Sequence, residues 1–443
     1  MSDKEEKQIP EHKKLLKIID EYLVDLECLR EMRTTVIPVL EDKDKERSQT
    51  IKQAMQVARV EESKGEAVDE SESTDEDESQ EDKKKKVKYN FLPRDYEFLM
   101  KNIRKINKAQ ELFEKQLIVT LVSRYDEFLG SLLKLVLEKN PSWLISSEKT
   151  ITYKELIDLK SIDKAIEGVI LKEVDKLLRD SHEDHINYID DKLKLGIATH
   201  FDNLPDFLEI AERRNLFVHT GGVVSNQYID SCNKFGYDIK EVKCDDHLAS
   251  STEYFENAFL VYFEIGLRIA QAAYRRLFPN DLEIADHSLN NLAIKFMNAG
   301  EYNLAEIITN FDLSIPEKLR KKDTENLYFA HINQAIAKKF QGKEFEKGLA
   351  GIPWNVFHPK YSLSLHVLRE EFDEAGKLMK SEEIKSSVSK DSFRTWPVFR
   401  DFRGTPEFQE AYKENYDEDY KPDFKKDMKL KREQENKALE TES

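Results

Sequence analysis

The stretch KINKAQELFEKQLIVTLVSRYDEFLGSLLKLVLEK, residues 105–139, decides the fold class of this chain. Its apolar residues cover most of the circumference of a helix, as in helices that lie at the centre of a bundle. Asn140 and Pro141 follow directly, and the residue before a proline disfavours helical backbone, so we expect the helix to end there. A central helix of this kind must be covered by other helices. The sequence therefore predicts an all-α protein.

Three further stretches have the amphipathic pattern of bundle helices. They are residues 153–181, residues 204–219 before Thr220-Gly221-Gly222, and residues 250–278 before Pro279. Glycine and proline at such places end a helix. Together with the central helix, these stretches predict a bundle of four or five helices over residues 89–280.

A helical extension, residues 1–60, precedes this bundle. Apolar residues recur at three- and four-residue spacings in its first part: Leu15, Ile18, Ile19, Tyr22, Leu23, Leu26 and Leu29. Pro38 interrupts the pattern and a weaker one follows around Ile51, Met55 and Val57, so we expect a helical hairpin. Two helices alone bury too little surface, so the hairpin packs either on a partner or second copy, or on the body of its own chain.

Most of the acidity of the chain lies in one tract. The net charge is -17, and residues 61–82 alone hold 12 acidic residues against the single basic Lys64, a net of -11. Such a segment, with the four lysines at 83–86 that follow it, buries no apolar surface. Residues 61–88 are therefore predicted to be a disordered linker. Since the remainder is only mildly acidic, the total charge is weak evidence against an RNA substrate.

The three cysteines, Cys28, Cys232 and Cys244, are odd in number and have no CxxC spacing. That pattern argues against a disulfide framework and against a zinc site. The first residues lack the apolar stretch of a signal peptide, and no apolar run approaches the length of a membrane span. Motifs of the types GxxxxGK, GxGxxG and GxSxG are missing, so nucleotide-driven and serine-hydrolase functions lack support. We expect a soluble cytoplasmic protein with no cofactor.

Residues 281–420 have a different pattern, clearest in NNLAIKFMNAGEYNLAEII at 290–308. Its key residues stand at offsets 0, 1, 4, 8, 10 and 13: Leu292, Ala293, Phe296, Gly300, Tyr302 and Ala305. These are the first-helix and turn positions of a tetratricopeptide repeat. The turn recurs more weakly around Gly342 and around Phe372 and Ala375. We expect a degenerate tetratricopeptide-like array that binds a protein partner, or else ordinary helical hairpins; the charged tail, 421–443, should fray.

Residues 213–219, RRNLFVH, carry the candidate chemistry. Asn215 and His219 are four residues apart and share a helix face, with Arg214 about 100° away by rotation. His219 lies in the final turn, where the helix dipole favours imidazolium, and Asn215 could fix which ring nitrogen is protonated. An arginine that grips phosphate beside such a histidine suits acid–base chemistry on a phosphodiester. RNA supplies its own nucleophile, the 2′-OH, so this site needs no metal.

The segment Arg214-Asn215-x-x-x-His219 resembles the R-polar-x-x-x-H motif of the HEPN superfamily of ribonucleases and toxins, in particular its bacterial abortive-infection and antiphage branch. The preceding SRYDEFL (123–129) and the continuation HTGGVVSNQYI (219–229) agree with it, and the likeness covers residues 90–279. It implies a metal-independent endoribonuclease whose active site forms in a homodimer, with Arg214 and His219 as the catalytic pair and Asn215 as their polar companion. Gly221 departs from the pattern, since many catalytic members carry tyrosine there.

Other functions and other residues compete with this interpretation. The chain could instead be a non-catalytic HEPN and repeat scaffold, or an antitoxin-type partner. Asp126 and Glu127 could contribute to the site, or could simply pair with Arg124. His182 and His185, in DSHEDHIN, have an HxxH spacing that could hold a metal, but solvated polar helix residues are the preferred interpretation.

Overall fold

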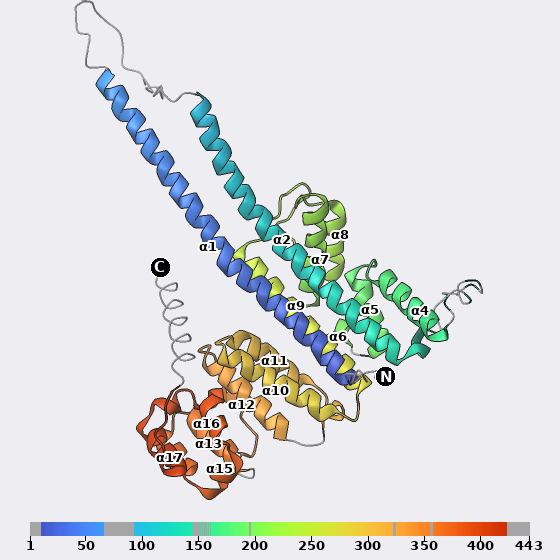
Figure 1. Ribbon diagram of the computed structural model, residues 1–443, viewed down its shortest axis with the longest axis vertical. Helices are drawn as coiled ribbons and strands as arrows, with labels where there is room; N and C mark the ends of the chain where they lie inside the picture. Colours follow the sequence, from blue (N-terminus) through green and yellow to red (C-terminus); the bar gives the residue numbers. More distant parts are fainter. Residues whose placement is uncertain are drawn as a thin grey trace, which may run out of the picture.

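The computed structural model describes residues 10–65, 93–144, 161–194, 196–321, 325–354 and 358–422, with four single residues between 152 and 159. Over these ranges the protein is all-α (Figure 1). One isolated antiparallel bridge joins Val223 to His247. None of the helices in them is long and apolar enough to cross a membrane. Residues 66–88 of the predicted linker and 423–443 of the predicted tail lie outside the described residues.

Three long helices form the spine of the bundle: α1 (Glu11–Gly65), α2 (Pro93–Lys139) and α9 (Thr252–Leu277). The helices α1 and α2 run antiparallel and side by side, and α9 packs against both (Figure 1). The sequence predicted a central helix that ends before Asn140, and α2 confirms this. Its buried apolar residues are Leu117, Ile118, Leu121, Val122, Tyr125, Phe128, Leu129, Leu132, Leu133, Leu135, Val136 and Leu137.

Helix α1 is continuous, so the predicted hairpin is wrong. Pro38 is exposed within the helix, which continues to Gly65, five residues into the predicted linker (61–65). An interior proline costs a helix about 3 kcal/mol. The preceding turns bury Leu15, Leu23 and Leu26, each of which stabilises the packed helix by about 1.5–3 kcal/mol, so burial outweighs the proline.

The α1 helix packs on the body of its own chain, which was one of the two predicted alternatives. Tyr22 donates its hydroxyl hydrogen to the Tyr262 carbonyl at 2.7 Å. Its ring occupies the space beside Gly266 of α9, where a Cβ atom would lie 2.2 Å from the ring. The close approach of α1 to α9 therefore depends on this glycine.

Shorter helices complete the bundle on the other side of α2: α4 (Ile162–Leu177), α5 (His182–Leu193), α6 (Ile197–His200), α7 (Leu204–His219) and α8 (Asn226–Phe235), with the 3₁₀ turn η1 (Pro141–Leu144) at the end of α2. The bounds of α7 confirm the predicted helix and its stop at Thr220. Both α2 and α9 contact α7, so the candidate motif lies on a helix anchored in the bundle.

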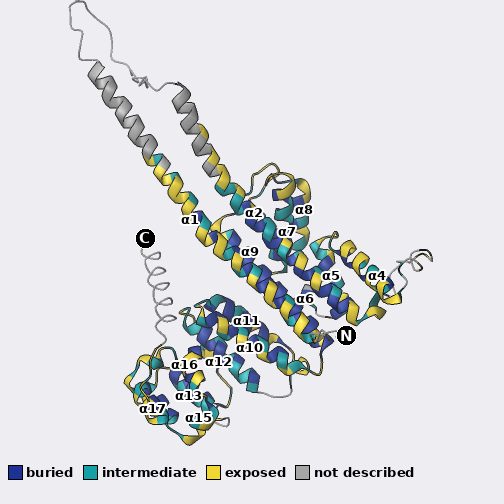
Figure 2. Ribbon diagram, in the orientation of Figure 1, coloured by how far each residue is buried: buried dark blue, intermediate teal, exposed yellow. Residues whose placement is uncertain are grey.

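The C-terminal part is a series of shorter helices. They are α10 (Leu282–Asn298), α11 (Tyr302–Ser314), η2 (Glu317–Leu319), α12 (Glu325–Lys339), η3 (Glu346–Gly348), α13 (Pro359–Leu368), α14 (Phe372–Met379), α15 (Glu382–Ser387), α16 (Lys390–Thr395), η5 (Pro397–Phe399), η6 (Phe402–Gly404) and α17 (Pro406–Tyr416). The buried apolar residues of these helices belong to the same core cluster as most of those in the bundle. Figure 2 shows buried residues in both parts.

A buried ionic network lies where α9 meets α10 and α11. Arg275 pairs with Asp286 at 2.7 Å, and Arg320 pairs with Asp312 at 2.9 Å. Arg275 also donates to the Leu319 carbonyl, and Asp286 accepts from the Lys321 backbone N–H. Burial raises the pKa of the Asp312 carboxyl to about 6, although the charges of Arg320 and Arg275 oppose this. The junction thus contains charges that are stable only while their partners are present.

The three turns singled out in the sequence have one backbone geometry. Gly300, Gly342 and Glu370 all have a positive φ, at 83°, 69° and 62°. In each turn the next residue donates its N–H to a carbonyl five residues earlier: Glu301 to Phe296 (2.9 Å), Lys343 to Lys338 (2.9 Å) and Glu371 to His366 (2.8 Å). This is the hydrogen bond of a Schellman helix end, in which glycine is preferred.

Replacing Glu370 by glycine should therefore stabilise the protein. The left-handed conformation is unfavourable for a residue with a Cβ atom, so we expect the free energy of unfolding to rise by about 0.5–1 kcal/mol. Urea unfolding followed by helical circular dichroism measures it. The control is Glu371→Gly, because φ is -80° there and glycine gains nothing. Equal effects of the two changes would contradict this account of the turn.

Candidate functional site

The end of α7, where His219 lies, is fixed by contacts with α2 and by two glycines. The buried ammonium of Lys115 donates to the Gly221 carbonyl at 2.6 Å, which places a cation at the negative end of the helix. Gly222 has a φ of 99°, and a Cβ atom there would lie 2.7 Å from the Leu248 carbonyl. The chain turns sharply here, and His219 is left exposed in the last turn of α7.

The first arginine of the RRNLFVH stretch, Arg213, is a structural residue. Its Nε donates at 2.6 Å to the carboxylate of Glu209, which is fully buried, and its guanidinium lies 3.9 Å from the Tyr254 ring centroid. Glu209 also accepts from the hydroxyls of Tyr228 at 2.6 Å and Tyr254 at 2.8 Å. Arg213 thus balances a buried carboxylate that ties α7 to α8 and α9.

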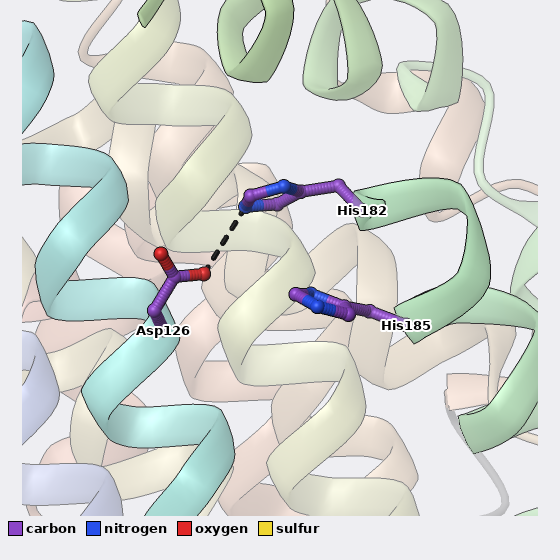
Figure 3. A group of neighbouring side chains, drawn as sticks. All are labelled: Asp126, His182 and His185. Carbon is purple, nitrogen blue, oxygen red and sulfur yellow. Dashed lines mark ion pairs between the residues drawn. The ribbon is translucent and has the colours of Figure 1, made fainter. Parts of the chain in front are cut away.

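The second arginine, Arg214, faces α2 and α5. Its Nη2 donates to Asp126 Oδ2 at 3.1 Å, and the two side chains keep 24% and 23% of their surface exposed. The other oxygen of Asp126 lies 3.2 Å from Nε2 of His182, the first residue of α5 (Figure 3). Glu127 instead pairs with Arg124 at 2.8 Å. Of the two acidic residues that the sequence left undecided, Asp126 therefore contacts the candidate site, and Glu127 pairs with Arg124.

The interpretation of His182 and His185 as solvated residues is wrong. His185 is fully buried, the His182 side chain is 10% exposed, and the two ring centroids lie 4.8 Å apart. The reason is the register of α5, whose buried face includes Ile186, Ile189 and Leu193 as well as His185. A capping box between Ser181 and Asp184 starts the helix so that its first residue, His182, lies against Asp126.

The tautomer of His185 follows from its surroundings. Its Nε2 lies 2.8 Å from the Leu177 carbonyl, which can only accept, so Nε2 carries the hydrogen and Nδ1 is bare. Burial lowers the pKa of His185 to about 4, and the nearby His182 adds to this shift. The ring is therefore neutral at pH 7.

Asn215 lies beside Glu212, one turn earlier in α7, whereas the sequence predicted it beside His219. Burial raises the pKa of the Glu212 carboxyl, while the hydrogen bond from Asn215 and the charges of His182 and Arg214 lower it. Asn215 is thus attached to the polar cluster around Arg214.

Arg214 and His219 point to different sides of α7. Five positions along an α-helix correspond to a rotation of about 140°. The structure brings Arg214 together with Asp126 and His182, and it leaves His219 exposed at the end of the helix. Within one chain, the described contacts of Arg214 therefore do not include His219.

Sequence reasoning considered Asp126, His182 and His185 but assigned none of them to the site, and it did not consider Glu212. The HxxH spacing was a usable signal, because positions i and i+3 share a helix face. Nothing in the sequence placed that face against Asp126, which comes from a helix more than fifty positions earlier.

Comparison with known proteins adds no assignment. No protein-family model matches the chain, and no match was found among curated proteins or solved structures. The function must therefore be argued from the side chains of the site.

Proposed function

We propose that this protein is a metal-independent endoribonuclease, the effector of a bacterial defence or toxin system, built on a HEPN-like bundle. The observation that carries the proposal is the arrangement of α7. Arg214 is oriented by Asp126 while 24% of its side-chain surface remains exposed, and His219 is exposed on the same helix. Both groups that the chemistry needs are thus presented by one rigid element.

The reaction uses the 2′-OH of the RNA itself. One His219 takes the 2′-OH proton as O2′ bonds to the adjacent phosphorus, and the bond from phosphorus to O5′ breaks. The leaving oxygen takes a proton from an acid, which leaves a 2′,3′-cyclic phosphate and a 5′-OH. Arg214 stabilises the negative charge on the non-bridging oxygens.

A homodimer supplies the missing acid. One imidazole acts as the base, and the equivalent histidine of a second copy acts as the acid when two α7 helices face each other across a two-fold axis. The same symmetry brings the histidine of one copy toward the arginine of the other. This removes the difficulty that the two residues lie on different sides of a single α7.

The C-terminal helices α10–α17 are proposed to be a degenerate tetratricopeptide-like array that receives a protein partner and so regulates cleavage. Support comes from the three turns at Gly300, Gly342 and Glu370, which share one geometry. The turns are 42 residues apart from 300 to 342 and 28 residues apart from 342 to 370. A regular tetratricopeptide array repeats every 34 residues, so the proposed array is a degenerate one.

One observation favours the alternative, a non-catalytic interaction scaffold. The ion pair with Asp126 gives Arg214 a structural purpose, since it fixes α7 against α2. In a scaffold the bundle would serve dimerisation only, and the C-terminal array would carry the function.

The test is incubation of the purified chain with total cellular RNA in EDTA, beside an Arg214→Ala/His219→Ala variant. We expect the wild type alone to cut RNA and to leave cyclic-phosphate 3′ ends. Absence of cleavage by either protein, with a dimer present on size-exclusion chromatography, would support the scaffold.

A further inference from the structure

We propose that Asp126, His182 and His185 form a binding site for one divalent ion of the zinc type, directly behind Arg214 (Figure 3). The site goes beyond the proposed ribonuclease and does not depend on it. In this site the ion supports the cluster and takes no part in cleavage.

Three ligand atoms converge between α2 and α5. One potential ligand atom of each of Asp126, His182 and His185 lies within 4.8 Å of the other two. The atoms of these side chains that remain available are Asp126 Oδ1, His182 Nε2 and His185 Nδ1. Each is shielded from solvent and makes no hydrogen bond to any described residue. Buried polar atoms are rarely left without a partner, and a single ion would give all three a common one.

The second polar atom of His185 and that of Asp126 are already held, as in a metal site. His185 donates its Nε2 hydrogen to the Leu177 carbonyl, and Asp126 accepts from Arg214 at Oδ2. Partners of this kind orient metal-binding histidines and carboxylates and direct their free atoms at the ion.

The donor set selects the class of ion. Two imidazole nitrogens and one carboxylate oxygen suit Zn²⁺, whereas Mg²⁺ and Ca²⁺ prefer oxygen alone. Ligand atoms around a tetrahedral zinc ion lie about 3.3 Å apart. Asp126 and His182 already lie 3.2 Å apart, so a shift of His185 by at most about 1.5 Å completes the site. Water would take the fourth position.

A proton is the rival occupant. A protonated His182 would form an ion pair with Asp126 across the 3.2 Å separation. That arrangement leaves the buried Nδ1 of His185 without a partner, whereas a metal ion engages all three atoms. The geometry therefore favours the ion.

The consequence for the protein is mechanical. An ion on Asp126 and the two histidines joins α2 to α5 and fixes the carboxylate that orients Arg214. Asp126, His182 and His185 are positioning residues in this view.

The experiment uses the full chain stripped of metal and titrated with Zn²⁺ in a calorimeter, with Co²⁺ as a spectroscopic probe of coordination. We expect one equivalent of Zn²⁺, a tetrahedral Co²⁺ spectrum and no response to Mg²⁺. A free zinc concentration about a hundred times Kd should raise Tm by about 3 °C. His182→Gln and Asp126→Asn should each weaken zinc binding at least about tenfold.

The matched control is His287→Gln, since the His287 side chain is 54% exposed and faces Glu283 across 3.6 Å on α10. It should bind zinc like the wild type. Failure of the wild type to bind zinc, or equal binding by His182→Gln, would overturn the site, and neither measurement needs a folded His185 variant. Cleavage of RNA in EDTA tests Arg214 and His219 separately, so the two proposals fail independently.

Discussion

Replacement of His219 by alanine should lower the rate of RNA cleavage by about 10²–10⁴-fold, the usual contribution of a general acid or base. The fold should remain intact, because the side chain is exposed at the end of α7. Cleavage of a short RNA is measured together with the thermal unfolding temperature of each variant. Loss of activity without loss of stability identifies a chemical function of His219.

Two controls sharpen this result. His287→Ala removes another exposed histidine and should leave cleavage unchanged. Arg214→Ala should also abolish cleavage, but it frees Asp126 from its ion pair, so only part of its effect is chemical. Full activity of the His219→Ala chain would exclude the proposed chemistry.

Mixing subunits tests the composite site. When equal amounts of wild-type and His219→Ala chains exchange, about a quarter of the dimers contain two wild-type copies. A centre that needs both histidines should then retain about a quarter of the activity, whereas independent centres should retain about half. The second result would contradict a shared reaction centre.

The largest loss of stability is expected for Arg275→Met. The change leaves the carboxylate of Asp286, which is 2% exposed, without its ion-pair partner, and an uncompensated buried charge costs about 3–5 kcal/mol. The free energy of unfolding from urea denaturation measures the loss. The pair joins the last turn of α9 to α10, so the C-terminal helices should also become more accessible to proteases.

The neighbouring residue supplies the control. Arg276→Met makes the same chemical change on an exposed side chain and should alter the free energy of unfolding by less than about 0.5 kcal/mol. Adding Asp286→Asn to Arg275→Met removes the buried charge and should recover much of the stability. Similar losses for Arg275→Met and Arg276→Met would show that the buried pair has no special importance.

The periodicity of apolar residues was sufficient to predict a helix and its end wherever the local sequence pattern is the main determinant. The long apolar repeat of residues 105–139 and the stop signals at Pro141, Thr220 and Pro279 set helix ends correctly. Pro38 misled the same reasoning, because the energy that keeps α1 continuous comes from burial against α2 and α9. A rule that considers only the neighbouring sequence cannot include this energy of packing.

The same distinction between local pattern and tertiary packing applies to the candidate site. The sequence by itself determined an all-α chain and placed Arg214, Asn215 and His219 on one helix, since these depend on short spacings. Only the tertiary structure assigned Arg213 to a buried carboxylate and Arg214 to Asp126, and only it buried His182 and His185 beside them. Such contacts join helices that are far apart in the chain. They are selected by the free energy of packing whole helix faces against each other, and a short sequence spacing does not encode that energy.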